Sequence, residues 1–423
     1  MSDYKSFSAM RKFIKNLFSI KNNGINKEIK VLGVTIKINR NFGVEDFYKF
    51  PIQTNKIVFS NFNGKGFGCN PKYIAEKLIQ SGEKYDLVWL CEKSFMQKKN
   101  FPKEIRLVNY KSLGAMKEIV TSKVFIHNVH SNSLIHRGWE KRDGQIYINT
   151  WHGSLGIKKI DAGVTTKSFV ETTWYKTAKK DSSMIDYVLS NSSFDNMVFK
   201  NDFWYDNGIL EFGHPRNDIF FWKDEDKSKI KDKVYKKLDI NPNSKIFLYV
   251  PSFRDNGKLD CYEIDILGIK SALMQKTNEE WVILVRLHPH LRKYSKKLFN
   301  FSDSVIDATS YPDIQELLVS SDIAATDYSS CIFDFMFSKK PAFIYAPDIE
   351  EYNTDRGFYY PLETTPFPIA TNNKEMIDNI MNFSEDEYKI KVEEFLKSKG
   401  CFEDGKASER VAEFIHSQVN LKE

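Results

Sequence analysis

From about residue 55, short apolar stretches alternate with helix-like stretches, and this alternation constrains the fold more than any other feature. One helix is expected over NPKYIAEKLIQSG, with Pro71 near its start and Gly82 near its end, the usual positions of these residues. Strands alternating with helices form a parallel sheet covered on both faces, so the pattern predicts an α/β protein. The strands of this first series are expected at KIVFSNF (56–62), YDLVWLC (85–91), KVFIHN (123–128), QIYINTW (145–151) and IDYVLSNSS (185–193).

A charged stretch at 222–244 precedes a second series of strands. A chain of 423 residues exceeds one ordinary core and suits two domains of roughly 200 residues each. We expect two doubly wound α/β domains, at 55–235 and 236–400, facing a cleft, with a C-terminal helix in 401–423. Ligands of such sheets bind outside the carboxyl ends of the strands. The second series comprises KIFLYVPSF, EWVILVRLH, SVIDA, DIAATD and PAFIYAP.

The N-terminal segment, residues 1–54, carries a short basic and amphipathic stretch, SAMRKFIKNLFSI (8–20). Its apolar side chains recur at helical spacing, and two interpretations stay open: a helix lying in an anionic lipid surface, or a helix packed on its own protein. EIKVLGVTIKINRN (28–41) is expected to form a strand pair or edge hairpin.

Charge and cysteine content limit the partners and the compartment. The formal net charge of +6 suggests an anionic partner but does not distinguish a nucleotide, a nucleic acid or a lipid surface. The five cysteines are far apart, which argues for a reducing compartment and against disulfides or a zinc site. No apolar run approaches the ~20 residues of a membrane span, and no signal peptide opens the chain. We therefore expect a cytosolic protein or one on the cytosolic face of a membrane.

Five polar segments each follow an expected strand, at the edge where ligands of α/β sheets bind. ATDYSS offers helix-start N–H groups and the hydroxyls of Ser329 and Ser330 to a phosphate, whereas the simpler interpretation is N-capping by Asp327 or Ser329. VRLHPH offers Arg286 and His288 to a diphosphate. With Arg254 and Arg216, these side chains would form a cationic cluster facing the serines. The five segments are NTWHGS (149–154), GHPRND (213–218), VPSFRD (250–255), VRLHPH (285–290) and ATDYSS (325–330).

His152 is the sharpest catalytic candidate. It stands at a strand end, Gly153 leaves room for a substrate, and Lys158 is near enough in sequence to attract an anion. A neutral imidazole is the usual group to accept a proton from an alcohol, although an isolated histidine is as often a buried structural one. The Asp-Glu-Asp run at 224–226 lies in a charged, solvated stretch, so no metal site is expected.

Several motifs in sequence order resemble the CDP-glycerol glycerophosphotransferase family, which comprises teichoic-acid primases and polymerases and related capsule polymerases. The resemblance covers about residues 55–415. Its motifs are NFNGKGFGCNPKYIAEKL (61–78), TWHGSLGIKKI (150–160), LSNSSFDN (189–196), GHPRND (213–218), VPSFRD (250–255), RLHP (286–289), SDIAATDYSSCIFDF (321–335), KKPAFIYAPDIEEYNTDRGFYYP (339–361) and EDGKASER (403–410).

The resemblance implies a GT-B-like fold with two Rossmann-type domains. It also implies a metal-independent transferase without a cofactor, which moves polyol phosphate from a CDP-linked donor onto a hydroxyl of a lipid-linked or polymeric acceptor and releases CMP. It implies that His152 is the base on the acceptor hydroxyl, that His288 assists at the donor pyrophosphate, and that Ser329 and Ser330 hold that pyrophosphate. Arg216, Arg254, Arg286, Asp327 and Lys158 complete the expected substrate contacts. The expected location is the cytoplasmic face of the cell membrane, with no nucleic acid as partner.

Two departures from the family pattern put the acceptor in doubt. The family commonly continues T-P-L-K after W-H-G, whereas Ser154, Leu155, Gly156 and Ile157 stand here, and it often has Tyr in place of His214. CDP-glycerol is the expected donor. CDP-ribitol is the alternative donor. The alternative functions are a nucleotide-sugar glycosyltransferase of the same architecture and a membrane-docked assembly component without activity.

Overall fold

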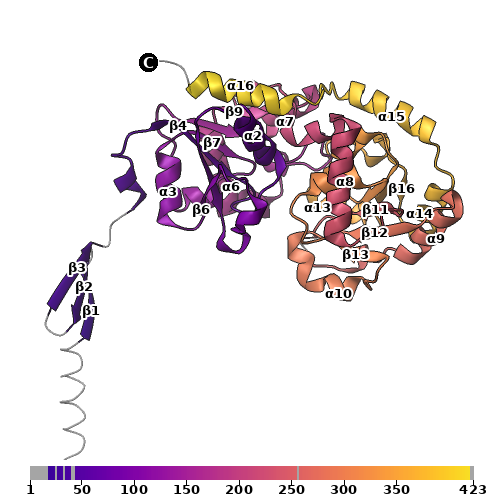
Figure 1. Cartoon of the computed structure of the whole chain (residues 1–423), viewed down its shortest axis with the longest axis horizontal. Coiled ribbons are helices and arrows are strands. Elements are labelled where there is room, and N and C mark those ends of the chain that lie inside the picture. Colours follow the sequence, from indigo (N-terminus) through magenta and orange to yellow (C-terminus); the bar gives the residue numbers. More distant parts are fainter. Residues whose placement is uncertain (1–17, 24–25, 32–33, 40–42, 255–256, 420–423) are drawn as a thin grey trace, which may run out of the picture.

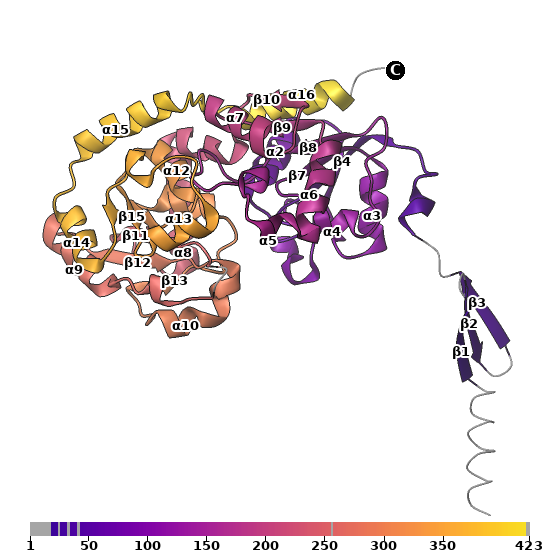
Figure 2. The same cartoon turned by 180° about the vertical axis from the view of Figure 1, so that it is seen from behind.

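The computed structural model describes residues 18–23, 26–31, 34–39, 43–254 and 257–419. It contains one small antiparallel sheet and two parallel sheets. The small sheet lies apart from the two large domains in both views (Figures 1 and 2). Its strands are β1 (Phe18–Asn23), β2 (Asn26–Val31) and β3 (Val34–Asn39).

The predicted hairpin at 28–41 is present as the β2–β3 pair, in which Val31 is opposite Val34. The predicted amphipathic helix over 8–20 lies mostly outside the described residues. Where it overlaps them the prediction is wrong, because residues 18–20 belong to β1 and pair with β2, Phe18 opposite Val31. Pairing with a neighbouring strand satisfies the main-chain groups there in place of helical hydrogen bonds.

The N-terminal domain is built on a seven-stranded parallel sheet of order β10-β9-β8-β7-β4-β5-β6. One face packs on α3 (Leu113–Val120) and α7 (Ser193–Asp202), and the other on α2 (Cys69–Gln80). Shorter helices are α4 (Asn132–Ile135) and α5 (Lys167–Val170), followed by α6 (Thr173–Met184). The strands are β4 (Gln53–Ser60), β5 (Asp86–Cys91), β6 (Arg106–Asn109), β7 (Ser122–His127), β8 (Ile146–Asn149), β9 (Tyr187–Leu189) and β10 (Gly208–Leu210).

The C-terminal domain is built on a six-stranded parallel sheet of order β13-β12-β11-β14-β15-β16. Its strands are β11 (Lys245–Tyr249), β12 (Trp281–Val285), β13 (Val305–Asp307), β14 (Ile323–Thr326), β15 (Ala342–Tyr345) and β16 (Ile369–Ala370). Its helices are α8 (Asp224–Leu238), α9 (Ile266–Thr277), α10 (Ser295–Leu298), α11 (Ile314–Ser320), α12 (Cys331–Phe335), α13 (Ile349–Arg356), α14 (Asn373–Met381) and α15 (Glu385–Ser398). Two parallel sheets with helices on both faces confirm the predicted α/β class.

The chain crosses between the domains twice. The predicted boundary at 235–236 lies inside α8, whose buried Val234 and Tyr235 belong to the core of the second sheet. After α15, whose N-cap is Ser384, the last helix α16 (Ala407–Val419) returns to the first domain. Its Val411 and Ile415 pack with residues of α2 against the first sheet. Figure 1 shows α16 lying along the N-terminal domain. This return helix fastens the two domains together.

No helix in the described part of the chain is both long and apolar enough to cross a membrane.

Candidate active site

Each parallel sheet has one point at which the strand order reverses. In the first sheet β4 lies between β5 and β7, so the reversal lies between β4 and β7. The loops after these two strands are joined, since Asn128 accepts from the Phe62 N–H at 2.8 Å and donates to Asn61 at 2.9 Å. Such reversal points are the usual ligand sites of open α/β sheets.

His152 lies against this joined pair of loops. Its Nδ1 is 2.7 Å from the carbonyl oxygen of Asn128. Because a carbonyl only accepts, Nδ1 carries the proton and Nε2 keeps a free lone pair. Burial lowers the pKa of His152 to about 4, and the neighbouring cations Arg216 and Lys158 act in the same direction. At neutral pH the ring is therefore uncharged and able to accept a proton at Nε2.

The turn that carries His152 is held from both domains. Trp151 and Leu155 adopt left-handed φ values of 49° and 52°, which are uncommon for residues with a side chain. The Leu155 N–H donates to Asp195 at 3.1 Å, and the Leu155 carbonyl accepts from the hydroxyl of Tyr360 in the C-terminal domain. The strained turn is thus fixed at its main chain by two side chains that sequence reasoning did not identify.

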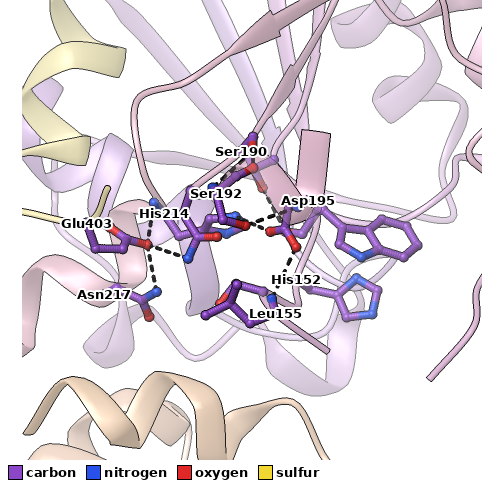
Figure 3. Close-up of polar contacts among 12 residues, drawn as sticks. His152, Leu155, Ser190, Ser192, Asp195, His214, Asn217 and Glu403 are labelled. Atoms are coloured by element: carbon purple, nitrogen blue, oxygen red, sulfur yellow. Dashed lines mark hydrogen bonds and ion pairs between the residues drawn. The ribbon is translucent and has the colours of Figure 1, made fainter. Parts of the chain in front are cut away.

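A polar cluster behind this turn links it to the C-terminal segment, as Figure 3 shows. His214 Nδ1 is 3.3 Å from the Asn70 amide, so its Nε2 faces Asp195 at 3.7 Å. Glu403 accepts from the main-chain N–H of His214 at 3.0 Å and from the side-chain amide of Asn217 at 2.9 Å. The segment before α16 therefore supports the turn of His152 through His214 and Asp195.

The second wall lies at the reversal point of the C-terminal sheet, between β11 and β14. Asp327 joins the two strand ends by accepting the Ser252 N–H at 2.9 Å. Arg254 donates to Asp327 at 2.7 Å and to Asp348 at 2.6 Å. Arg254 is only 4% exposed, and its guanidinium is engaged by these two carboxylates. The predicted substrate contacts Arg254 and Asp327 therefore form the frame beneath the second wall.

The two walls meet at the predicted phosphate turn. Ser330 precedes α12 without capping it through its side chain, and Asp327 is committed to the Ser252 and Tyr328 N–H groups. A Cβ atom at Gly153 would come within 3.1 Å of Ser330 Oγ, so Gly153 permits close approach of the His152 turn. Ser329 and Ser330 are partly exposed at this junction.

Arg216 lies behind the His152 turn. It pairs with Asp334 of α12 at 2.8 Å and donates to the carbonyl oxygen of His152. Ser154 also donates to Asp334, at 3.1 Å. Arg216 is 4% exposed, so in this structure its guanidinium fastens the two domains to each other and does not face the open side of the turn.

Lys72 and Tyr73 of α2 provide a second connection that sequence reasoning missed. Lys72 binds Asp313 at 2.7 Å and Glu316 at 3.0 Å, both in the C-terminal domain, and all three side chains are buried. The Tyr73 hydroxyl donates to the same Asp313 at 3.1 Å. The only sequence signal was a charged residue on the apolar side of a helix, which does not identify a partner 241 residues away.

His288 is exposed at the end of β12, where its Nδ1 accepts from the His290 N–H at 3.4 Å. Its ring stacks on Phe253, which follows β11, with the centroids 5.6 Å apart. A hollow of about 510 Å³ is lined here by Pro289, His290, Arg292 and Lys293. This basic hollow has the size of a small-molecule site and suits an anionic ligand.

Two further predicted contacts lie close to these walls. Arg286 is half-buried, donates to the Tyr311 carbonyl at 2.5 Å, and has its pKa lowered by burial. Lys158 pairs its main chain with Phe358 of the C-terminal domain and lies near enough to lower the pKa of His152. Among the described residues, no three His, Cys, Asp or Glu side chains gather in an arrangement that would hold a metal ion.

Comparisons with known proteins agree with this geometry. The family model described as CDP-Glycerol:Poly(glycerophosphate) glycerophosphotransferase matches residues 45–417. A teichoic acid poly(glycerol phosphate) polymerase of Bacillus spizizenii is 30% identical over 379 residues, which cover 86% of this chain and 92% of that protein. A teichoic acid glycerol-phosphate transferase of Staphylococcus aureus is also 30% identical, over 85% of this chain and 92% of that protein. By contrast, the match covers only 49% of a polymerase of Bacillus subtilis.

Among solved structures, that of the wall teichoic acid polymerase TagF superposes with a TM-score of 0.76 at 26% identity. The superposition covers 89% of this chain and 92% of the TagF chain. A further TagF structure is of a variant soaked with CDPG.

Proposed function

Because the chain belongs to the CDP-glycerol:poly(glycerophosphate) glycerophosphotransferase family, we propose that its two walls divide that reaction between them. The family is one of enzymes that transfer glycerol phosphate in teichoic acid synthesis, as the sequence motifs predicted. We assign the acceptor hydroxyl to the His152 wall and the diphosphate of CDP-glycerol to the wall of Ser329, Ser330 and His288. The close approach of Gly153 to Ser330 supports this assignment, because it brings the turn of the base and the phosphate turn together at one junction.

The proposed step uses the free lone pair of His152. The acceptor oxygen attacks the β-phosphorus of CDP-glycerol, its proton passes to His152 Nε2, and the bond from that phosphorus to the CMP oxygen breaks. The products are the extended acceptor and CMP. Phosphoryl transfer gains chiefly from positioning and from stabilisation of charge on the transferred oxygens. N–H groups at the start of α12, the serine hydroxyls and Arg286 are the groups we assign to that stabilisation.

The proposed location is the cytoplasmic face of the membrane, with the enzyme bound peripherally near a lipid-linked acceptor. The basic stretch 8–20 supports this location from the sequence. In the described part, Val170 and Trp174 are 39% and 40% exposed near Lys167 on α5 and α6. Deletion of residues 1–20 is expected to weaken binding to anionic liposomes. Unchanged binding would remove this segment from the proposal.

A donor panel tests the proposed function. The protein is incubated with an oligomeric glycerol-phosphate acceptor and CDP-glycerol, CDP-ribitol or UDP-glucose, and release of CMP or UDP is followed. We expect CMP from CDP-glycerol. Release only from CDP-ribitol would reassign the polyol, in line with a relative described as a teichoic acid ribitol-phosphate primase, 32% identical over 282 residues. Release of UDP alone would refute the proposal.

A further inference from the structure

A second hollow lies in the N-terminal domain, outside the two walls already described. We call it the acceptor-domain pocket; its volume is about 300 Å³, at the small end of ligand sites. Its side chains follow β4, β5, β6 and β7, which are neighbours in the sheet, so the pocket lies at the ligand-binding edge. They are Asn63, Glu92, Tyr110, Lys111, Ser133 and Arg137.

The floor of the acceptor-domain pocket is polar and ordered. The buried Tyr110 places its hydroxyl 2.8 Å from Asn63 and 2.5 Å from Ser133 Oγ. Arg137 donates to the carbonyl oxygens of Tyr110 and Ser112 at 2.7 and 2.6 Å, which fixes its planar guanidinium. Hydroxyl, amide and guanidinium groups held in this way match a ligand that carries both hydroxyls and a phosphate.

The charges of the lining side chains match a single negative charge. Lys111 lies 3.1 Å from Glu92, and together with Arg137 these charged side chains of the pocket sum to one positive charge. The Arg137 guanidinium has five N–H groups, more than its two main-chain bonds use. A phosphodiester carries one negative charge, unlike a nucleoside diphosphate, and is the better match for this pocket.

One lining residue of the acceptor-domain pocket is adjacent in sequence to a residue that contacts His152. Asn63 follows Phe62, whose ring lies 5.3 Å from the His152 ring, edge to face. A chain that presents its terminal hydroxyl to His152 can therefore pass Phe62 and place an earlier unit against Asn63 and Tyr110.

We propose that the acceptor-domain pocket binds an internal glycerol-phosphate unit of the acceptor chain, through its phosphodiester at Arg137 and Lys111 and its hydroxyl at Tyr110 and Ser133. This inference rests on the proposed function and adds the class of ligand held behind the reacting end. A binding site of this kind selects acceptors that already carry phosphodiester units.

The test compares two acceptors, an oligo(glycerol phosphate) of several units and an acceptor with a single unit, with CDP-glycerol as donor and the full chain. The variant is Lys111→Glu, because Lys111 is 69% exposed and its replacement leaves the core intact. The matched control is Lys103→Glu, since Lys103 is also exposed but precedes β6 at the opposite edge of the sheet. Ser133→Ala serves as a second variant that leaves the charge unchanged.

Lys111→Glu is expected to raise KM for the oligomer about tenfold and to leave KM for the single-unit acceptor unchanged. The substitution removes a positive charge beside the phosphodiester and adds a carboxylate that repels it. Titration of the oligomer without donor should show the same weakening in Kd, and Ser133→Ala a smaller one. Equal KM changes for both acceptors, or no difference between Lys111→Glu and Lys103→Glu, would overturn the inference. Absence of CMP release from wild type with either acceptor would instead refute the proposed function.

Discussion

The carboxyl group of Glu403 gives a quantitative test of the polar cluster behind the His152 turn. Glu403 Oε1 accepts from the His214 N–H and from the amides of Asn191 and Asn217, whereas Oε2 is buried without a hydrogen-bond partner. Burial raises the pKa of Glu403 to about 7 from a model-peptide value of 4.5. Replacement by Gln keeps the accepting oxygen and removes the charge.

The sign of the effect follows from proton binding. Between pH 4.5 and about 7 the folded state holds the Glu403 proton that the unfolded state has lost, so the free energy of unfolding falls as pH rises through this range. A pKa shift of this size lowers the free energy of unfolding by about 3 kcal/mol by pH 8. The Glu403→Gln variant has no such titration, so its stability relative to wild type should rise by that amount between pH 5 and pH 8.

Thermal unfolding at the two pH values measures this change. About 3 kcal/mol should shift the Tm difference between Glu403→Gln and wild type by roughly 3–4 °C between pH 5 and pH 8, in favour of the variant, because a chain of 423 residues has an unfolding entropy of about 0.9 kcal/mol/K. Glu409→Gln in the adjoining helix α16 is the control, since Glu409 is 48% exposed and should show no such shift. A Tm difference that is equal at both pH values would show that burial does not destabilise the charged form of Glu403.

Three further predictions concern the His152 turn. Arg216→Met should lower the free energy of unfolding by about 3–5 kcal/mol, because it leaves Asp334 buried without its cation; a shift in Tm of less than a degree would contradict this role. Leu155→Pro introduces the residue common in the family and should lower the free energy of unfolding by about 3 kcal/mol. Proline lacks the N–H that donates to Asp195 and cannot adopt a φ of 52°. An unchanged Tm would mean that the turn has another conformation. The kcat/KM should stay level from pH 8 to pH 6 and fall only as pH approaches the His152 pKa of about 4, whereas an acidic limb near 6.5 would contradict the buried, neutral ring.

Local pattern predicted the architecture because each strand and helix shows its period within a few residues. The alternation from residue 55 gave the two parallel sheets. VPSFRD and ATDYSS follow the two strands at the second reversal point, whereas GHPRND follows the edge strand β10 and reaches the His152 turn through Arg216. The small sheet was predicted only in part, since β1 required knowledge of its pairing with β2.

The contacts within the site depend on residues far apart in the chain, and these no local pattern reveals. Asp195 lies 40 residues from Leu155, and Tyr360 lies 205 residues from it. Arg216 was expected to face phosphates because an arginine in a strand-end motif often does so, but Asp334, 118 residues on, engages it. The return of α16 to the first domain was likewise invisible, because its apolar face fits either core.

The proposed reaction requires that His152 accept the proton of the acceptor hydroxyl. His152→Asn tests it most directly, because the Asn amide can still donate to the Asn128 carbonyl as Nδ1 does, while no lone pair remains at the position of Nε2. We predict that kcat for CMP release from CDP-glycerol falls by roughly 10²–10⁴, the range for loss of a general base, while the Kd for CDP-glycerol is unchanged. A variant that retains kcat within a few fold of wild type would contradict the claim.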